Sequence, residues 1–159
     1  MDKNIKRFIK LTINEELHEL VINVNRTLLE VLREDLLLTG SKESCGQGAC
    51  GSCTILLDGL PVRSCLLLAV EAEGRVITTI EGLSRGEKLH PVQDAFIEHH
   101  AIQCGFCSPG MIITTSALLK KNPKPTEDEI RRAISGNICR CTGYAKIVDA
   151  VKALADSGR

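Results

Sequence analysis

Cysteine constrains what this chain of 159 residues can fold around more than any other feature. Its eight cysteines form two sets of four, and no thiol is left over: Cys45, Cys50, Cys53 and Cys65 in the first half, then Cys104, Cys107, Cys139 and Cys141 in the second. Each set has the ligand number of a tetrahedral sulfur site. The spacing therefore predicts one metal-organised region in each half of the chain.

The charge balance and hydropathy exclude several classes of function. Twenty basic residues match twenty acidic ones, so no overall field attracts nucleic acid or anionic lipid. The N-terminus lacks a signal-peptide core, and no apolar run approaches the roughly 18–20 residues of a membrane span. We therefore expect a cytoplasmic protein without a membrane span. In that compartment thiols stay reduced, and eight cysteines indicate metal binding or catalysis in preference to disulfides.

The first half of the chain is predicted to form a sheet crossed by one helix. Alternating residues predict strands at 8–13 and 20–24, joined as a hairpin by a turn at 14–16. Asp58-Gly59 predicts a second hairpin between strands at 54–57 and 61–64. A further strand is expected at 75–80. Thr27 and Glu30 form a capping box, and Leu28, Leu32 and Leu36 make a helical stripe that faces the sheet. This arrangement is β-grasp-like.

The second half has helical periodicity. Helices are predicted at about 91–100, 108–120, 126–135 and 145–155, with Pro91 at a first helical position and Thr126 with Glu129 as a second capping box. Four short helices predict a compact bundle. The expected fold class is α+β, with a first domain at 1–82, a polar linker at 83–90 and an all-α four-helix domain at 91–159.

The first cysteine set lies in a glycine-rich loop. Cys45, Cys50 and Cys53 follow the C-x4-C-x2-C spacing of plant-type [2Fe–2S] ferredoxins, with glycine at 46, 48 and 51. Glycine permits positive φ and close backbone approach, so exposed amides can point at the sulfurs. Cys65 returns from the far side of the predicted hairpin. The alternative is a zinc knuckle, although zinc sites favour C-x2-C pairs.

The spacing of the second cysteine set identifies the kind of metal site less specifically. Cys104 and Cys107 precede one predicted helix, and Cys139 and Cys141 precede another, so two helix N-termini would favour a negative cluster. A zinc site with four cysteines and a thioredoxin-like dithiol are the alternatives, the latter without its βαβ context. A Rieske centre needs two histidine ligands. His18, His90, His99 and His100 all lie outside the cysteine loops and are interpreted as surface residues or helix-end charges.

Three motifs together resemble a known family. They are Cys45-Gly-x-Gly-x-Cys-Gly-x-Cys53, Gln103-Cys-Gly-Phe-Cys-Ser-Pro-Gly-Met111 and Gly136-Asn-Ile-Cys-Arg-Cys-Thr-Gly-Tyr144. In this order they resemble the small iron–sulfur subunit of the xanthine oxidase family of molybdenum hydroxylases, over essentially the whole chain. The resemblance implies a plant-type ferredoxin-like β-grasp domain followed by a four-helix bundle, each with one [2Fe–2S] cluster.

The same resemblance implies partners and site residues. The bundle cluster would lie nearer the molybdenum cofactor, with Gln103 hydrogen-bonded to its pterin and Cys141 close to it, and the other cluster nearer FAD. A large molybdopterin subunit and a medium FAD subunit would complete a dimer of heterotrimers. No part of this chain resembles a flavin- or molybdenum-binding domain, so those cofactors are expected on separate subunits.

Two other classes of function compete with an electron-transfer subunit. One is a zinc-stabilised interaction module, and the other is a free-standing ferredoxin or redox sensor, which often carries a surface of one charge sign. Gln103 would then be an ordinary solvated side chain. The substrate stays open among purines, aldehydes, carbon monoxide, N-heterocycles and aromatic thioesters, because its pocket belongs to another subunit.

Overall fold

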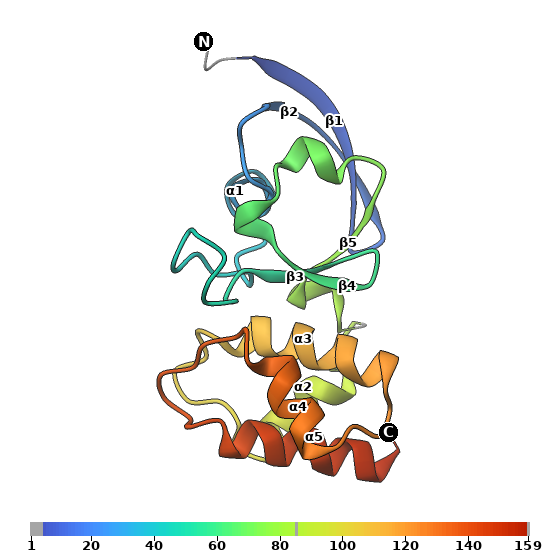
Figure 1. The fold of residues 1–159 in the computed structure, drawn as a ribbon. Coiled ribbons are helices and arrows are strands. Elements are labelled where there is room, and N and C mark those ends of the chain that lie inside the picture. The colour runs from blue at the N-terminus through green and yellow to red at the C-terminus, as the bar shows by residue number, and fades with distance from the viewer. Residues whose placement is uncertain (1–4, 85, 159) are drawn as a thin grey trace.

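The first half of the chain forms a five-stranded sheet in the order β2-β1-β5-β3-β4 (Figure 1). Its strands are β1 (Lys6–Ile13), β2 (Glu16–Asn23), β3 (Thr54–Leu57), β4 (Leu60–Arg63) and β5 (Val76–Thr78). β1 pairs parallel with β5, and the other pairings are antiparallel. Both predicted hairpins are confirmed. Asn14-Glu15 and Asp58-Gly59 take positive φ at each central residue, as two-residue hairpin turns require.

The structure is a computed structural model that describes residues 5–84 and 86–158. Residues 1–4, where the first predicted domain begins, Arg85 in the predicted linker and Arg159 at the end of the helical region lie outside the described residues.

The helix that crosses the sheet is shorter than predicted. The capping box is confirmed: Thr27 accepts from the Glu30 amide, and Glu30 accepts from the Thr27 amide. α1 (Leu28–Glu30) then widens into a π-helical turn, Val31–Asp35, in which the Leu36 amide donates to the Val31 carbonyl. Leu28 and Leu32 are fully buried as expected, whereas Leu36 is only partly buried because it lies beyond the wider turn.

The second half forms the helices α2 (Pro91–Glu98), α3 (Ser108–Lys121), α4 (Glu127–Ile134) and α5 (Ala145–Ser157). Pro91 is at the start of α2, and the Thr126–Glu129 capping box opens α4, as predicted. The four helices share a second apolar core that includes Phe96, Met111, Ile130, Ile147 and Val151. The capping residues in the sequence thus predicted the first residue of each helix to within about one position.

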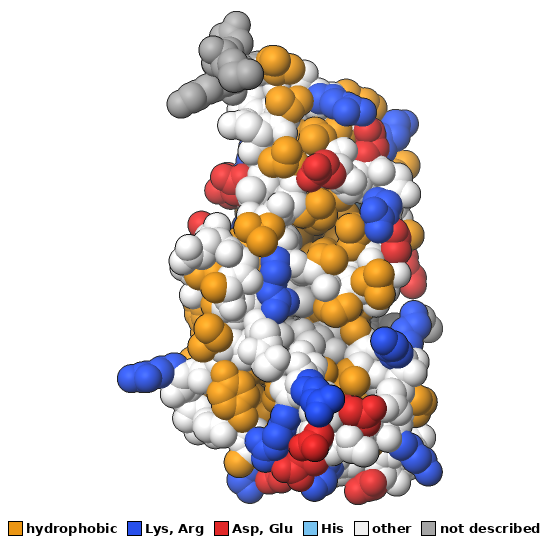
Figure 2. All heavy atoms as spheres, in the orientation of Figure 1, with side chains coloured by type: hydrophobic (Ala, Val, Ile, Leu, Met, Phe, Trp, Pro, Cys, Tyr) orange, Lys and Arg blue, Asp and Glu red, His pale blue; other side chains and the backbone are white. Residues whose placement is uncertain are grey.

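The surface carries both signs of charge. Figure 2 shows basic and acidic side chains interspersed over the sheet and the helices on one face. Among the described residues, none of the helices is both long enough and apolar enough to cross a membrane.

Candidate functional site

The first cysteine set lies in the loop between the π turn and β3, and Cys65 joins it from a short 3₁₀ turn after β4. Gly46, Gly48 and Gly51 all have positive φ, between 64° and 75°, which confirms why glycine recurs there. The Gly48 amide donates to the Cys65 sulfur. Backbone amides therefore point at sulfur in this loop, as the sequence predicts.

The sulfurs of this set approach one another in pairs. Cys53 and Cys65 are buried together against Leu29, and Cys50 contacts Cys45. Burial, followed by the Cys53 contact, raises the pKa of Cys65 to about 11. Burial acts the same way on Cys50, but bonds from Ser52 and Cys45 outweigh it and lower the pKa of Cys50 to about 6. The loop thus favours the thiolate at Cys50, the form that binds metal.

The second set also forms two pairs. Cys141 Sγ lies 3.6 Å from Cys104 Sγ, and Cys107 contacts Cys139. Cys107 is the residue directly before α3, and Cys139 and Cys141 lie in the loop before α5. The Thr142 hydroxyl donates to Cys139 Sγ over 3.1 Å and lowers the pKa of Cys139 despite its partial burial. Burial, followed by the Cys139 contact, raises the pKa of Cys107 to about 12.

Pairing is the arrangement that a two-iron cluster needs. All eight cysteines are free thiols. In residues 5–84 and 86–158, no three His, Cys, Asp or Glu side chains are grouped as they would be around one metal ion. A four-cysteine zinc site requires all four sulfurs on one ion, whereas a [2Fe–2S] cluster takes two thiolates on each iron. The paired sulfurs of each set fit the two irons of such a cluster.

The two sets meet at one junction. A hollow of about 210 Å³ is lined by cysteines of both sets together with Phe106 and Ile138. The Ile138 amide donates to the Cys50 carbonyl over 2.8 Å. Asn137, only 2% exposed, donates to the Gly51 carbonyl over 3.0 Å. Sequence reasoning missed the role of Asn137, because its partners come from the other half of the chain.

Tyr144 supports the Cys139 loop from the helical side. Its hydroxyl accepts from the Cys139 amide over 2.8 Å and donates to the Asn137 carbonyl over 3.1 Å. Its φ of 66° is in the left-handed region. The sequence named Tyr144 as the end of a motif and gave it no role.

Tyr144→Phe is expected to keep the ring and remove both hydrogen bonds. Leaving two partly buried backbone groups unpaired should lower the free energy of unfolding by about 1–3 kcal/mol. It should also shift the reduction potential of the second metal centre, because hydrogen bonding around the sulfurs sets it. Calorimetry and a potentiometric titration measure the two effects. An unchanged melting temperature and potential would contradict the role given to the hydroxyl.

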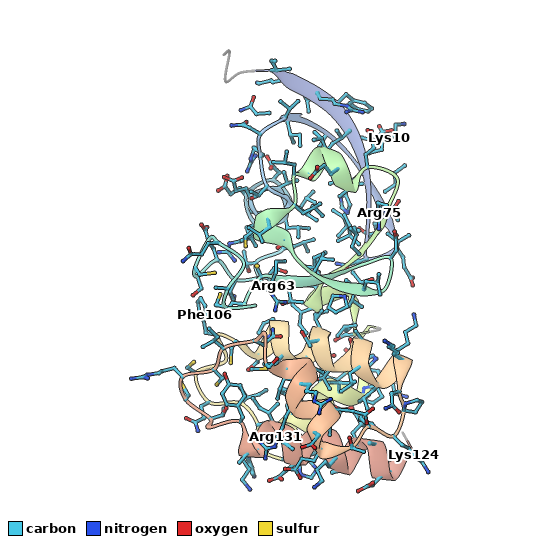
Figure 3. All side chains as sticks on the ribbon, viewed as in Figure 1. Lys10, Arg63, Arg75, Phe106, Lys124 and Arg131 are labelled. Carbon is cyan, nitrogen blue, oxygen red and sulfur yellow. The ribbon has the colours of Figure 1, made fainter. Side chains whose placement is uncertain are left out.

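Gln103 and Cys141 lie at the surface. Gln103, Cys104 and Cys141 are exposed, and the neighbouring Phe106 is 45% exposed. Figure 3 places Phe106 at the margin of the molecule, on the side of the cysteine loops. Gln103 is thus an exposed residue that directly precedes Cys104 of the Cys104–Cys141 pair.

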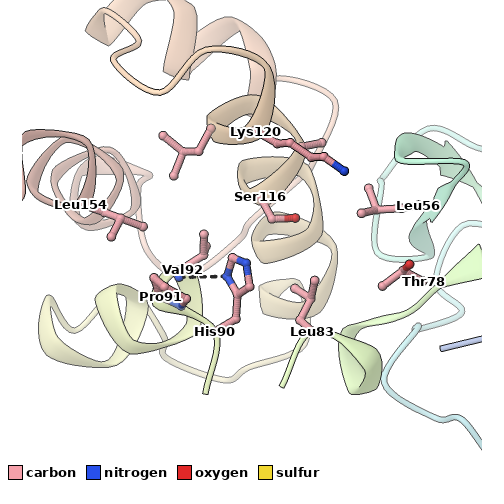
Figure 4. Close-up of a pocket in the computed structure, with 11 residues that line it drawn as sticks. Leu56, Thr78, Leu83, His90, Pro91, Val92, Ser116, Lys120 and Leu154 are labelled. Carbon is pink, nitrogen blue, oxygen red and sulfur yellow. Dashed lines mark hydrogen bonds between the residues drawn. The ribbon is translucent and has the colours of Figure 1, made fainter. Parts of the chain in front are cut away.

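Two of the histidines, His90 and His99, lie at the ends of α2. His90 Nδ1 accepts from the Val92 amide at the start of α2, beside a hollow of about 440 Å³ between the sheet and α3 (Figure 4). Burial lowers the pKa of His90. His90 is therefore a helix-end residue, as expected, and it caps α2 through a side-chain hydrogen bond. His99 ends α2, as a helix-end residue was expected to do.

Two family models match successive parts of the chain. Residues 11–78 match a 2Fe-2S iron-sulfur cluster binding domain, and residues 79–152 match a [2Fe-2S] binding domain. Each match contains one complete cysteine set.

Curated relatives cover nearly the same length. The chain is 49% identical over 144 residues to the nicotinate dehydrogenase small FeS subunit of Eubacterium barkeri, covering 91% of this chain and 92% of the relative. It is 50% identical over 143 residues to the nicotine 6-hydroxylase small subunit of Paenarthrobacter nicotinovorans, covering 90% and 86%.

A solved structure has the same fold. A chain of quinoline 2-oxidoreductase from Pseudomonas putida 86 is 52% identical, with a TM-score of 0.92 over 97% of this chain and 96% of that one.

Proposed function

Because the chain belongs to the small iron–sulfur subunits of the xanthine oxidase family of molybdenum hydroxylases, we propose a specific role for each of its cysteine sets. It is the electron-transfer subunit of a molybdenum-containing oxidoreductase and carries two [2Fe–2S] clusters. Cys45, Cys50, Cys53 and Cys65 hold one cluster; Cys104, Cys107, Cys139 and Cys141 hold the other. The pairing of sulfurs within each set is the observation that supports this assignment.

Each cluster belongs to its own domain. Residues 1–82 form a β-grasp domain around the first cluster, residues 83–90 are the linker, and residues 91–159 form a four-helix bundle around the second. The separate apolar cores of the sheet and the helices support this division.

The bundle cluster faces the molybdenum cofactor, and the ferredoxin-type cluster faces FAD. Gln103 and Cys141 support this orientation, because both residues are exposed. Cys141 is one of the two sulfur ligands in the Cys104–Cys141 pair, so a pterin held by a partner subunit can contact this pair directly. The clusters supply one-electron redox chemistry. This chain's residues hold them in place, donate amide hydrogen bonds to their sulfurs and exclude water from Cys53 and Cys65. The even surface charge is less suited to a free-standing ferredoxin.

The partners are a large molybdopterin subunit and a medium FAD subunit, arranged as a dimer of heterotrimers. Purification of the native complex tests this arrangement. A stable complex that contains molybdenum, flavin and all three chains supports it, and its mass gives the stoichiometry. A chain that purifies alone from its native source with both clusters supports the diffusible ferredoxin instead.

Of the substrate classes that the sequence leaves open, we propose N-heterocyclic compounds as the one to test first, alongside the aldehydes for which other similar proteins are named. The relatives above are named for nicotinate and nicotine, and the solved structure is named for quinoline. Turnover of nicotinate and quinoline by the purified complex, compared with xanthine and benzaldehyde, tests this assignment. Faster turnover of benzaldehyde than of any heterocycle would contradict it.

Gln103→Ala is expected to leave both clusters intact and weaken retention of the molybdenum cofactor or lower turnover by about 10–100-fold, as loss of an outer hydrogen-bonding partner does elsewhere. Metal analysis and steady-state kinetics measure both effects. Gln47→Ala, at an exposed position in the first cysteine loop, is the matched control. Unchanged molybdenum content and turnover would remove Gln103 from the site.

A further inference from the structure

The C-terminal end of α3 borders two hollows. One, of about 440 Å³, separates α3 from the sheet, and the other, of about 400 Å³, lies between α3, α4 and the β3–β4 hairpin. Lys120 lines both hollows, and Lys121 lines the second. We propose that this end of α3 binds another subunit of the complex, through a segment of that subunit in which carboxylates stand beside apolar side chains. The inference rests on the proposed function, because it assumes such a subunit.

The two lysines form no ion pair in the part of the chain that the structure describes. The basic side chains that are paired with carboxylates there lie elsewhere: Arg7, Lys10, Arg26, Arg75, Arg131 and Lys152. Lys120 and Lys121 are both exposed, so they place two adjacent positive charges at the end of α3. Lys88 adds a third at a neighbouring hollow that shares His90 with the first. An acidic segment complements this group of charges.

Apolar side chains lie on both sides of the lysines. We call the contact region the α3 surface; it comprises Leu56, Leu60, Leu118, Leu119, Lys120 and Lys121. Leu60, at the tip of the β3–β4 hairpin, is 66% exposed. An exposed ion pair contributes little affinity by itself, so buried apolar contact supplies most of it and the lysines select which segment binds.

The layout favours a polypeptide over a small molecule. Lys120 and Ala117 line both hollows, so a ligand that fills one hollow leaves the other empty. A polypeptide segment can place one apolar side chain in each hollow and a carboxylate at Lys120. Strand addition is not the mode of binding, although β4 is at the edge of the sheet, because Pro61 has no amide hydrogen to donate.

The first hollow offers a second donor for a carboxylate. His90 Nδ1 accepts from the Val92 amide, so the proton of the uncharged ring is on Nε2. Figure 4 shows His90 and Lys120 lining the same hollow, with Ser116 of α3 among the residues between them. A carboxylate in this hollow is therefore recognised by hydrogen-bond donors as well as by charge.

The α3 surface is separate from the cysteine sets. α3 begins directly after Cys107, and its 14 residues span about 20 Å. Substitutions at its C-terminal end therefore test the contact without touching a proposed iron ligand.

Cross-linking of the native complex with a carbodiimide tests the contact, because this reagent joins a lysine only to a carboxylate that it touches. We expect amide links from Lys120 or Lys121 to Asp or Glu in one segment of another subunit. Both lysines should also acetylate more slowly in the complex than in the chain alone. Links only to a second copy of this chain, or equal acetylation in both states, overturn the proposal. Protection without any link to a protein would indicate a small acid instead and also overturn it.

Lys120→Glu and Leu60→Ser test the charged and the apolar parts of the α3 surface separately. Lys6→Glu on β1 and Leu17→Ser on β2 are the matched controls, because Lys6 is exposed and Leu17 is 62% exposed, close to the value for Leu60. Each variant complex is diluted, and its mass gives the dissociation constant of the other subunit. Iron content and melting temperature show that the variant chain has folded.

We expect Lys120→Glu to raise that dissociation constant about tenfold at low salt and less at high salt, because salt screens the repulsion. Leu60→Ser should raise it about fivefold or more, the scale of loss that marks an energetically important interface residue. Wild-type binding by both variants, or equal losses in the controls, overturns the proposal. If Lys120→Glu binds less iron, Lys121→Glu decides by the same criteria. Failure of the proposed function would instead appear in the wild-type chain, as missing iron or as purification without any other subunit.

Discussion

Cys104→Ser should remove the bundle cluster and stop electron flow from substrate to acceptor. Iron should fall from about four to about two atoms per chain, since each cluster holds two irons. Turnover should fall by more than about 100-fold, beyond the losses seen when only an outer partner is removed. The physical reason is the pairing of Cys104 with Cys141: without its partner, Cys141 alone cannot complete the ligands of one iron.

Cys45→Ser is the reciprocal control for that experiment. It should remove the ferredoxin-type cluster and keep the bundle cluster, so reduction of molybdenum by substrate persists while reduction of the flavin stops. Iron analysis, paramagnetic resonance of the reduced complex and reduction of a dye that accepts electrons from flavin distinguish the two variants. Normal turnover of Cys104→Ser with the bundle cluster missing would refute the proposed order of the relay.

Gly51→Ala should disrupt the junction where the two cysteine sets meet. Its φ of 75° costs an alanine about 1–2 kcal/mol, and its Cβ would lie 2.4 Å from the Gly136 carbonyl oxygen. Forcing backbones apart adds about 1–3 kcal/mol, as overpacking does in cores. The complex should therefore melt at a clearly lower temperature and bind less iron, because Cys50 and Cys53 flank this residue.

Gly74→Ala separates the cost of a positive φ from the cost of the steric clash at the junction. Gly74 has a φ of 76°, but a Cβ added there would meet no atom within 4 Å, so only the backbone cost applies. It should lower the melting temperature less than Gly51→Ala and leave the iron content unchanged. Scanning calorimetry with iron analysis measures both variants. Equal effects of the two substitutions would show that the junction contributes nothing beyond the strain of a positive φ.

Much of the cysteine chemistry could be read from the sequence, because spacing and local residues determine it. The glycines at 46, 48 and 51 have the positive φ that close wrapping requires. Capping residues such as Thr126 placed the helix starts, since their hydrogen bonds are made within a few residues of the cap.

What sequence reasoning missed depends on tertiary contacts. Arg63 and Asn137 reach across 73 and 86 residues to their carbonyl partners, and no local pattern encodes such a pairing. The wide turn at Val31–Asp35 was missed because its leucine spacing is that of an ordinary helix. The burial that lowers the pKa of His90 also depends on tertiary packing, so no local pattern predicts it.

Paramagnetic resonance of the substrate-reduced complex, with iron and labile sulfide analysis, tests the two-cluster relay most directly. The expected result is about four irons and four sulfides per chain, with two distinct signals of about one spin each, both produced by substrate alone. A single signal, or a colourless chain with about two zinc ions and no labile sulfide, would contradict it.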